Sequence, residues 1–142
     1  MKTFTLDEAN ALLPVLESLL RTAITCKQEL ERLQQQRQDL AHRIFLSGGS
    51  LLKISEEMAR KSEREGATQR LRDTLAEIDS IGVQVKDLDI GLLDFPFLAD
   101  GEIILLCWKM GEPSIGFWHT LDAGFAGRKP IDDRIAKDKK PN

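Results

Sequence analysis

The sequence predicts an α+β protein: a long antiparallel helical hairpin, coiled-coil-like, followed by a small three- to four-stranded antiparallel β-meander packed at its base. Two observations lead to this prediction. Over the first half of the 142-residue chain, apolar residues recur in steps of three and four, which is the period of a helix. After Gly82 the helical period ends, and short apolar runs rich in aromatic residues lie between glycine-containing turns, which is typical of strands.

The first helix is predicted from Asp7 to Phe45. Thr5 and Glu8 have the spacing of a capping box, in which each side chain bonds the backbone amide of the other residue. A coiled-coil seam follows, and Arg37 is its one non-apolar member. The seam consists of Ala9, Leu12, Leu16, Leu19, Ala23, Cys26, Leu30, Leu33, Arg37, Leu40 and Ile44.

A second helix is expected to start near Leu51, after the turn Ser47-Gly48-Gly49-Ser50, and to run back to about Ile81. Its segment KSEREGATQ, residues 61–69, offers a single apolar residue, Ala67. The middle of the first helix therefore faces a stretch of the second helix that has almost no apolar side chains to pack against. Two interpretations follow. Either the hairpin is weak there and breaks at Gly66, or the seam contacts another chain.

We favour the contact with another chain, most simply a second copy that completes a four-helix bundle. Long, thin apolar seams commonly oligomerise. A homo-oligomer, with a dimer favoured, or a protein partner is therefore expected. The residues predicted to make this contact are Leu30, Leu33, Arg37 and Leu40.

Three strands are predicted in the second half of the chain, at Gly91–Leu98, Glu102–Lys109 and Ser114–Leu121, and Val83–Lys86 could form a short strand before them. The dipeptide Asp100-Gly101 is a strong signal for a two-residue hairpin. The base of the helical hairpin is the expected cover for the sheet, because a sheet of this size is marginal by itself.

The positions of two strands follow from their residues. Pro96 cannot donate a ladder hydrogen bond, so its strand is expected at an edge of the sheet or to end there. The strand Glu102–Lys109 is apolar on both faces and is expected to be central. Trp108 and Trp118 are expected to fill the junction between sheet and helices.

Composition limits the function and the location. With 20 basic and 23 acidic residues the net charge is −3, which argues against a broad grip on nucleic acid or an anionic membrane. No apolar run approaches the length of a membrane span, and the start lacks a signal-peptide pattern. Cys26 and Cys107 lack zinc or redox spacing, so reduced packing cysteines in a cytoplasmic protein are expected.

The organisation expected is one domain over residues 1–131, with a helical arm (1–82) and a β-meander (83–131). Residues 132–142 are charged and are expected to form a disordered tail.

Polar residues that could hold a ligand gather in the second half of the chain. Carboxylates and a neutral imidazole could bind a divalent cation such as Mg, Mn, Fe or Zn, and a basic loop could grip an anion. Turn chemistry for the aspartates and a buried, hydrogen-bonded role for the histidine are the alternatives. These candidate residues are Asp87, Asp89, Asp94, His119, Asp122 and Arg128.

No arrangement typical of a catalytic triad is present, and no catalytic residue is predicted. Cys107 is the one conceivable nucleophile, but it lies in mid-strand among apolar neighbours. A thiol in that setting is usually inert.

The segment VKDLDIGLLDFPFLADGEIILLCWKMGEPSIGFWHTLDAGFAGRKPI, residues 85–131, resembles a bacterial family recorded as domain of unknown function 2203. The opening FTLDEANALLP, residues 4–14, is similar to the start of such proteins. The likeness rests on the combination of KDLD, GLLDFP, LCWKMGE, FWH and GFAGR, and extends to Ile131. The resemblance implies no activity, ligand or partner.

The function we expect is a non-catalytic oligomerisation or partner-docking scaffold that uses the helical arm. The alternative is a small metal- or anion-binding domain, or an enzyme, with its site in the β-meander. Nucleic-acid binding through the arm is a minor third possibility, because residues 27–72 carry 10 basic and 7 acidic groups.

Overall fold

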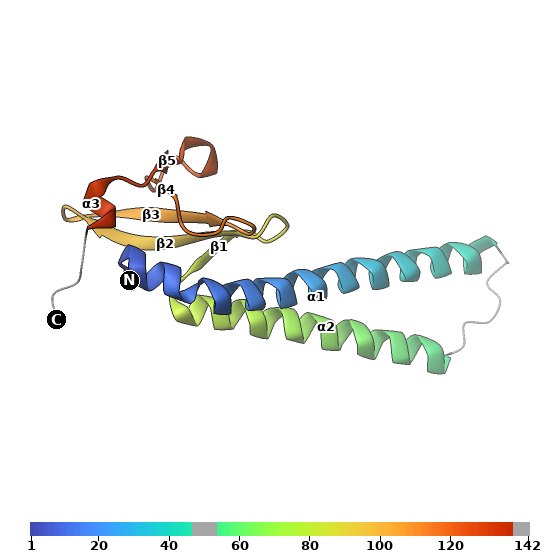
Figure 1. Ribbon diagram of the computed structural model, residues 1–142. Helices are drawn as coiled ribbons and strands as arrows, with labels where there is room; N and C mark the ends of the chain where they lie inside the picture. The colour runs from blue at the N-terminus through green and yellow to red at the C-terminus, as the bar shows by residue number, and fades with distance from the viewer. Residues whose placement is uncertain (47–53, 138–142) are drawn as a thin grey trace. The chain divides into compact units, whose positions relative to one another are not determined.

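The computed structural model describes residues 1–46 and 54–137, and within them it confirms the predicted α+β class (Figure 1). Two long helices precede an antiparallel sheet of five strands in the order β1-β2-β3-β4-β5. The elements are α1 (Leu6–Leu46), α2 (Ile54–Ile81), β1 (Gln84–Asp87), β2 (Leu92–Ala99), β3 (Glu102–Lys109), β4 (Phe117–His119), the 3-10 turn η1 (Phe125–Gly127), β5 (Lys129–Pro130) and α3 (Asp133–Ala136).

The capping box at the start of α1 is confirmed. The backbone amide of Thr5 donates to Oε1 of Glu8 at 2.9 Å, and the amide of Glu8 donates to Oγ1 of Thr5 at 3.1 Å. The second helix does not break at Gly66 but continues from Ile54 to Ile81. The turn expected at residues 47–50 and the helix start expected near Leu51 lie outside the described residues.

The chain divides into two compact units. One consists of Met1–Leu20 and Leu75–Asn142, and the other of Arg21–Thr74. The boundary expected at residue 82, between an arm and a sheet, stays a prediction: α2 ends at Ile81 and β1 begins at Gln84, but the two units divide the helices instead. The first turns of α1 and the last turns of α2 belong to the same unit as the sheet, because their apolar residues supply part of its core.

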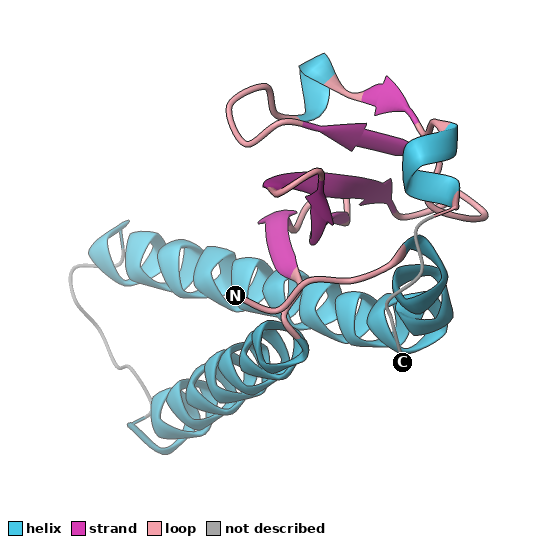
Figure 2. Ribbon diagram, turned by 90° about the vertical axis from the view of Figure 1, so that its left-hand side faces the viewer, coloured by secondary structure: helices cyan, strands magenta, loops and turns pink. Residues whose placement is uncertain are grey.

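The core of the first unit lies between the bases of the helices and one face of the sheet. Its strands lie side by side as one sheet (Figure 2). The side chains alternate between the two faces of each strand, and those facing the helices are large and apolar. The buried core comprises Phe4, Ala9, Leu13, Leu16, Leu20, Ile78, Val83, Leu93, Phe95, Phe97, Ala99, Ile104, Leu106, Trp108, Ile115 and Ile135.

The expectation for Pro96 is wrong, because β2 has neighbours on both sides and runs on to Ala99. The pairing of β1 with β2, however, stops at Gln84 and Asp94. Pro96 lies beyond that point, and its carbonyl oxygen accepts a hydrogen bond of 2.8 Å from the amide of Phe4. The backbone of Pro96 thus faces away from β3, where its missing N–H breaks no ladder bond.

The tight turn and the central strand are confirmed. Asp100 and Gly101 have φ angles of 52° and 82°, as a type I′ hairpin requires. Strand β3 lies in the middle of the sheet, and residues 104–108 are all buried. The fifth strand, β5, was not predicted because two residues carry no alternating pattern.

The start of the expected disordered tail is folded. Asp132 caps α3 by accepting from the amide of Ile135 at 3.3 Å. Ile135 is fully buried, and Arg134 lies 3.2 Å from Asp100 in the β2–β3 turn. Burial of one isoleucine in the core therefore holds residues 132–137, while residues 138–142 lie outside the described part of the chain.

The second unit is a hairpin of two helices with its own small core. Cys26, Leu33 and Ala67 are buried in it, and Arg70 bonds Glu29 across the helices at 3.4 Å. The expectation that Leu33 is unmatched and contacts another chain is wrong: it is 2% exposed in the single chain. Because α2 continues through Gly66, Ala67 stays on the buried face.

The other predicted contact residues of the hairpin keep some exposure. Leu30 and Leu40 are partly exposed and Arg37 is exposed. Whether they contact a second chain stays a prediction.

Candidate metal centre

The register of three strands brings Asp94, Cys107 and His119 to one face of the sheet. Asp94 of β2 lies directly opposite Cys107 of β3, and His119 of β4 lies opposite Leu105. Leu105 and Cys107 are two residues apart, so they share a face. This face is the one opposite to the core face that carries Leu93 and Leu106.

Asp94 and Cys107 also form the closer kind of strand pair. The carbonyl of Pro96, two residues after Asp94, points outward to the amide of Phe4, so Asp94 likewise has its backbone turned away from β3. Antiparallel partners without mutual hydrogen bonds have their side chains nearest to each other. The carboxylate, the sulfur and the imidazole nitrogen of the three residues lie within 4.8 Å of one another.

The hydrogen bonds of His119 define where its protons lie. Its Nδ1 is 2.7 Å from the carbonyl oxygen of Thr120, and its Nε2 is 3.0 Å from Oδ1 of Asp94. A carbonyl can only accept, so Nδ1 carries a hydrogen. The short contact between Nε2 and Oδ1 then requires one further proton, which the imidazole and the carboxyl group share.

The shared proton lets Asp94 and His119 satisfy each other's hydrogen bonds in a buried site. The side chain of His119 is 3% exposed and that of Asp94 is 1% exposed. A buried carboxylate or imidazolium without a partner is costly, whereas the pair satisfies both groups. Asp94 and His119 thus fasten β2 to β4 across the intervening strand β3.

Cys107 is a protonated thiol in this arrangement. The pKa of its thiol is raised to about 11, chiefly by burial; the hydrogen bond from Arg128 acts to lower this pKa, and the nearby carboxylate of Asp94 acts to raise it. Both nitrogens of His119 are hydrogen-bonded to Thr120 and Asp94, so neither nitrogen is hydrogen-bonded to the sulfur.

Arg128 forms a clasp beside the sulfur. Its two terminal nitrogens donate to the two carboxylate oxygens of Glu112 at 3.1 and 2.8 Å. The guanidinium carbon lies 3.9 Å from the ring centre of Phe117 and 4.6 Å from that of Phe125. One nitrogen also lies 3.9 Å from Sγ of Cys107.

The clasp is stabilised electrostatically. The pKa of Arg128 is raised, chiefly by its hydrogen bond to Glu112. Desolvation acts to raise the pKa of Glu112, but the hydrogen bonds from Arg128 and from the backbone amide of Lys109 outweigh it, so this pKa is lowered. Both groups are therefore charged near neutral pH, and their charges cancel.

The donor set has a defined chemistry. Thiolate sulfur, imidazole nitrogen and carboxylate oxygen are the three ligand types of zinc sites. Tetrahedral zinc would hold such atoms roughly 3.3 to 3.6 Å apart, given bonds of about 2.0 to 2.3 Å. The 3.0 Å contact between Asp94 and His119 would open slightly, and Sγ of Cys107 would move inward by up to roughly 1.5 Å.

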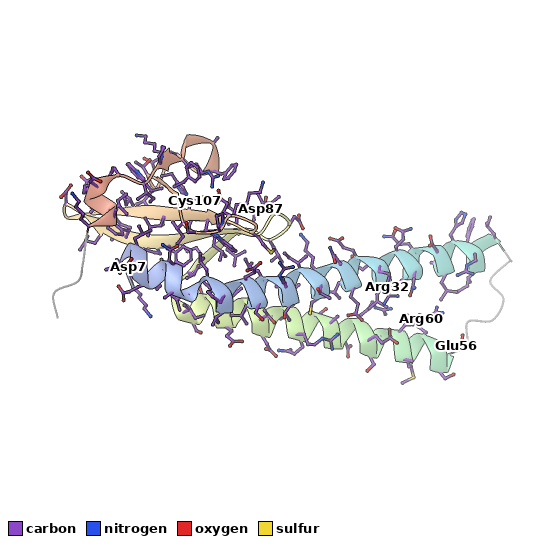
Figure 3. The ribbon with its side chains drawn as sticks, in the orientation of Figure 1. Asp7, Arg32, Glu56, Arg60, Asp87 and Cys107 are labelled. Carbon is purple, nitrogen blue, oxygen red and sulfur yellow. The ribbon has the colours of Figure 1, made fainter. Side chains whose placement is uncertain are left out.

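Three of the other predicted residues, Asp87, Asp89 and Asp122, are not part of this cluster. Figure 3 labels Asp87, at the end of β1, and Cys107, in β3. Asp87 caps its own turn by accepting from the amides of Asp89 and Ile90 at 3.0 and 3.4 Å. The chain turns after Asp87, so this aspartate has the turn role that was given above as the alternative to ligand binding. Asp89 and Asp122 are exposed.

Sequence reasoning missed one member of the cluster, Cys107, which was expected to be a packing residue. One signal was available: Asp94 interrupts the apolar run LLDFPF, and a carboxylate within a buried strand needs a polar partner.

The comparisons with known proteins define the family. A family model described as "Uncharacterized conserved protein (DUF2203)" matches residues 2–131, and the chain belongs to this family. No curated protein and no solved structure matches the chain. In the described part of the chain, no helix combines the length and the apolar character needed to cross a membrane.

Proposed function

We propose that this protein is a zinc-binding protein whose metal is held by Asp94, Cys107 and His119. The observation that carries the proposal is the convergence of three different zinc-donor atoms within 4.8 Å, on three neighbouring strands. The three residues are 13 and 12 positions apart in sequence, so the fold, rather than a local motif, brings them together.

The orientation of His119 supports this role. A histidine that binds a metal usually donates its second ring N–H to a backbone carbonyl or a carboxylate, which fixes the ring. Nδ1 of His119 already bonds the carbonyl of Thr120. Nε2 is thereby directed towards Asp94 and Cys107, where it can serve as a ligand once the shared proton is released.

The sulfur favours zinc over magnesium or manganese. Hard cations such as Mg²⁺ prefer oxygen ligands, whereas thiolates select softer metals. The charges also balance: one dication, the thiolate of Cys107 and the carboxylate of Asp94 sum to zero. Arg128 is neutralised by Glu112, so its guanidinium adds little net repulsion to a bound cation.

Metal analysis and cobalt spectroscopy test the proposal. The protein should bind about one equivalent of Zn²⁺, and Co²⁺ should give a thiolate-to-cobalt charge-transfer band. Cys107→Ser should remove the band and weaken zinc binding. Cys26→Ser is the matched control, because Cys26 is also buried but lies in the helical hairpin. Equal binding by the two variants would reject Cys107 as a ligand.

A second function remains a proposal: self-association or partner docking through the hairpin. It is supported by large apolar side chains towards the ends of its helices, where Phe45, Leu46 and Met58 are 80%, 68% and 66% exposed. Light scattering on Phe45→Ser combined with Met58→Ser tests it. A dimeric mass that becomes monomeric supports the proposal, and a monomeric parent protein rejects a homodimer.

A further inference from the structure

A groove in the helical hairpin collects positive charge. It has a volume of about 460 Å³ and takes Arg37 from α1 and Lys61, Arg64 and Arg72 from α2, whereas Glu65 is its one acidic lining residue. All these residues belong to the unit Arg21–Thr74. That unit has 11 basic and 8 acidic residues in its sequence, although the whole chain has a net charge of −3.

Half of these cations have acidic partners and half do not. Arg64 bonds Glu57 at 3.2 Å, and Lys61 lies 4.0 Å from Glu65 in an exposed pair. Arg37 and Arg72 have no hydrogen bond or ion pair within residues 1–46 and 54–137. The groove therefore keeps positive charge that its own carboxylates do not neutralise.

Arg37 occupies a position of the hairpin where an apolar residue is expected. It continues the seam four residues after Leu33, the last described residue of α1 that is buried. On the facing helix, no described residue from Ser55 to Gly66 is buried. The groove thus begins where the apolar packing of the hairpin ends. At this point Arg37 occupies the seam position and lies near the other basic residues of the groove.

We propose that this groove binds a small molecule that carries two or more phosphate groups. Like charges gathered between two helices destabilise the hairpin, and a bound oxyanion would neutralise them. Guanidinium groups bind phosphate through two parallel hydrogen bonds. The volume lies within the range of small-molecule sites, and the net negative charge of the chain disfavours a long polyanion such as duplex nucleic acid.

Calorimetry with inorganic pyrophosphate, at constant ionic strength set with NaCl, tests the proposal. Arg37→Leu should weaken binding at least about tenfold, the effect of losing one charge-assisted hydrogen-bonded contact, and Arg72→Gln should do the same. Arg37→Leu should also raise Tm, because it removes one of the like charges gathered between the two helices. Arg43→Gln is the control: it removes a charge from α1 at a residue that does not line the groove.

The outcomes discriminate clearly. Binding that is lost in Arg37→Leu and Arg72→Gln but kept in Arg43→Gln supports the site. Absence of pyrophosphate binding, or equal weakening in all three variants, overturns it, since the latter reflects general charge only. Tight binding of duplex RNA without binding of pyrophosphate also overturns it. These results do not depend on zinc, so they test the groove independently of the proposed metal centre.

Discussion

Nε2 of His119 lies 3.0 Å from Oδ1 of Asp94, and both side chains are almost completely buried. The two residues are 25 positions apart in sequence and belong to strands that are not neighbours. Their contact spans β3 on the face opposite to the hydrophobic core. It has two consequences: it fastens the outer part of the sheet, and it holds one of the two protons that a metal ion would displace.

Removal of either partner should destabilise the protein strongly. Asp94→Ala and His119→Ala should each lower the free energy of unfolding by about 3 to 5 kcal/mol, because each leaves a buried polar group unpaired. The double variant should cost less than the sum of the two, with a coupling energy of at least about 1 kcal/mol. Urea unfolding of metal-free protein measures these values, and additive effects would show that the contact contributes little.

Stability should fall in alkaline solution because of Cys107. Its pKa is about 11 in the folded protein and 9.0 in the unfolded reference. Above pH 9 the unfolded chain loses the thiol proton while the folded chain keeps it, so unfolding becomes more favourable until the pH passes the folded value. The loss should reach roughly 2 to 3 kcal/mol between pH 9 and 11.

The comparison variant for this pH dependence is Cys107→Ala. It should lower stability at neutral pH by leaving a small cavity, but its stability should decline less between pH 9 and 11. Urea midpoints at several pH values, measured on metal-free protein, provide the test. Parallel curves for the two proteins would contradict the raised pKa of Cys107.

The clasp between Glu112 and Arg128 should protect the thiol. In a Cys26→Ser background, Cys107 is the single remaining cysteine, so a thiol reagent reports on it alone. Glu112→Gln removes a charge-assisted bond worth roughly 1.5 to 3 kcal/mol and should accelerate labelling about tenfold or more. Glu102→Gln, at the start of β3, is the control, and equal rates in both variants would contradict a protective clasp.

Leu33 should act within the hairpin rather than between chains. Leu33→Ala should destabilise the protein by about 2 to 5 kcal/mol, as expected for a buried leucine, while Leu40→Ala, at a partly exposed position, should cost less. Circular dichroism during urea unfolding measures both. If Leu33→Ala instead reduced the mass in solution and left stability unchanged, an intermolecular role would be restored.

The fold could be predicted because its signals are local. The helical period, the Thr5–Glu8 capping box and the Asp100–Gly101 turn each act over a few residues, and each appears in the structure. The strand that contains Pro96 was wrongly predicted to lie at an edge of the sheet, because its position depends on a signal that is not local. A proline is accommodated in this interior strand because the pairing with β1 stops before Pro96, and no pattern in the nearby sequence predicts where that pairing stops.

The site was only half predictable for the same reason. Asp94 and His119 could be named as candidates by residue type, but their contact depends on the order and register of β2, β3 and β4. Cys107 was undervalued because its apolar neighbours in sequence suggested a packing role. Its polar neighbours come from the two adjacent strands and from Arg128, which lies 21 residues away along the chain.

Proton release on zinc binding tests the central claim most directly. The metal-free site holds two displaceable protons, one on the thiol of Cys107 and one shared by Asp94 and His119. Calorimetric titration of Zn²⁺ near pH 7, in buffers with different ionisation enthalpies, counts these protons. We predict one zinc bound with the release of two protons, reduced to one in Cys107→Ser. No zinc binding, or binding without proton release, would contradict the proposed metal centre.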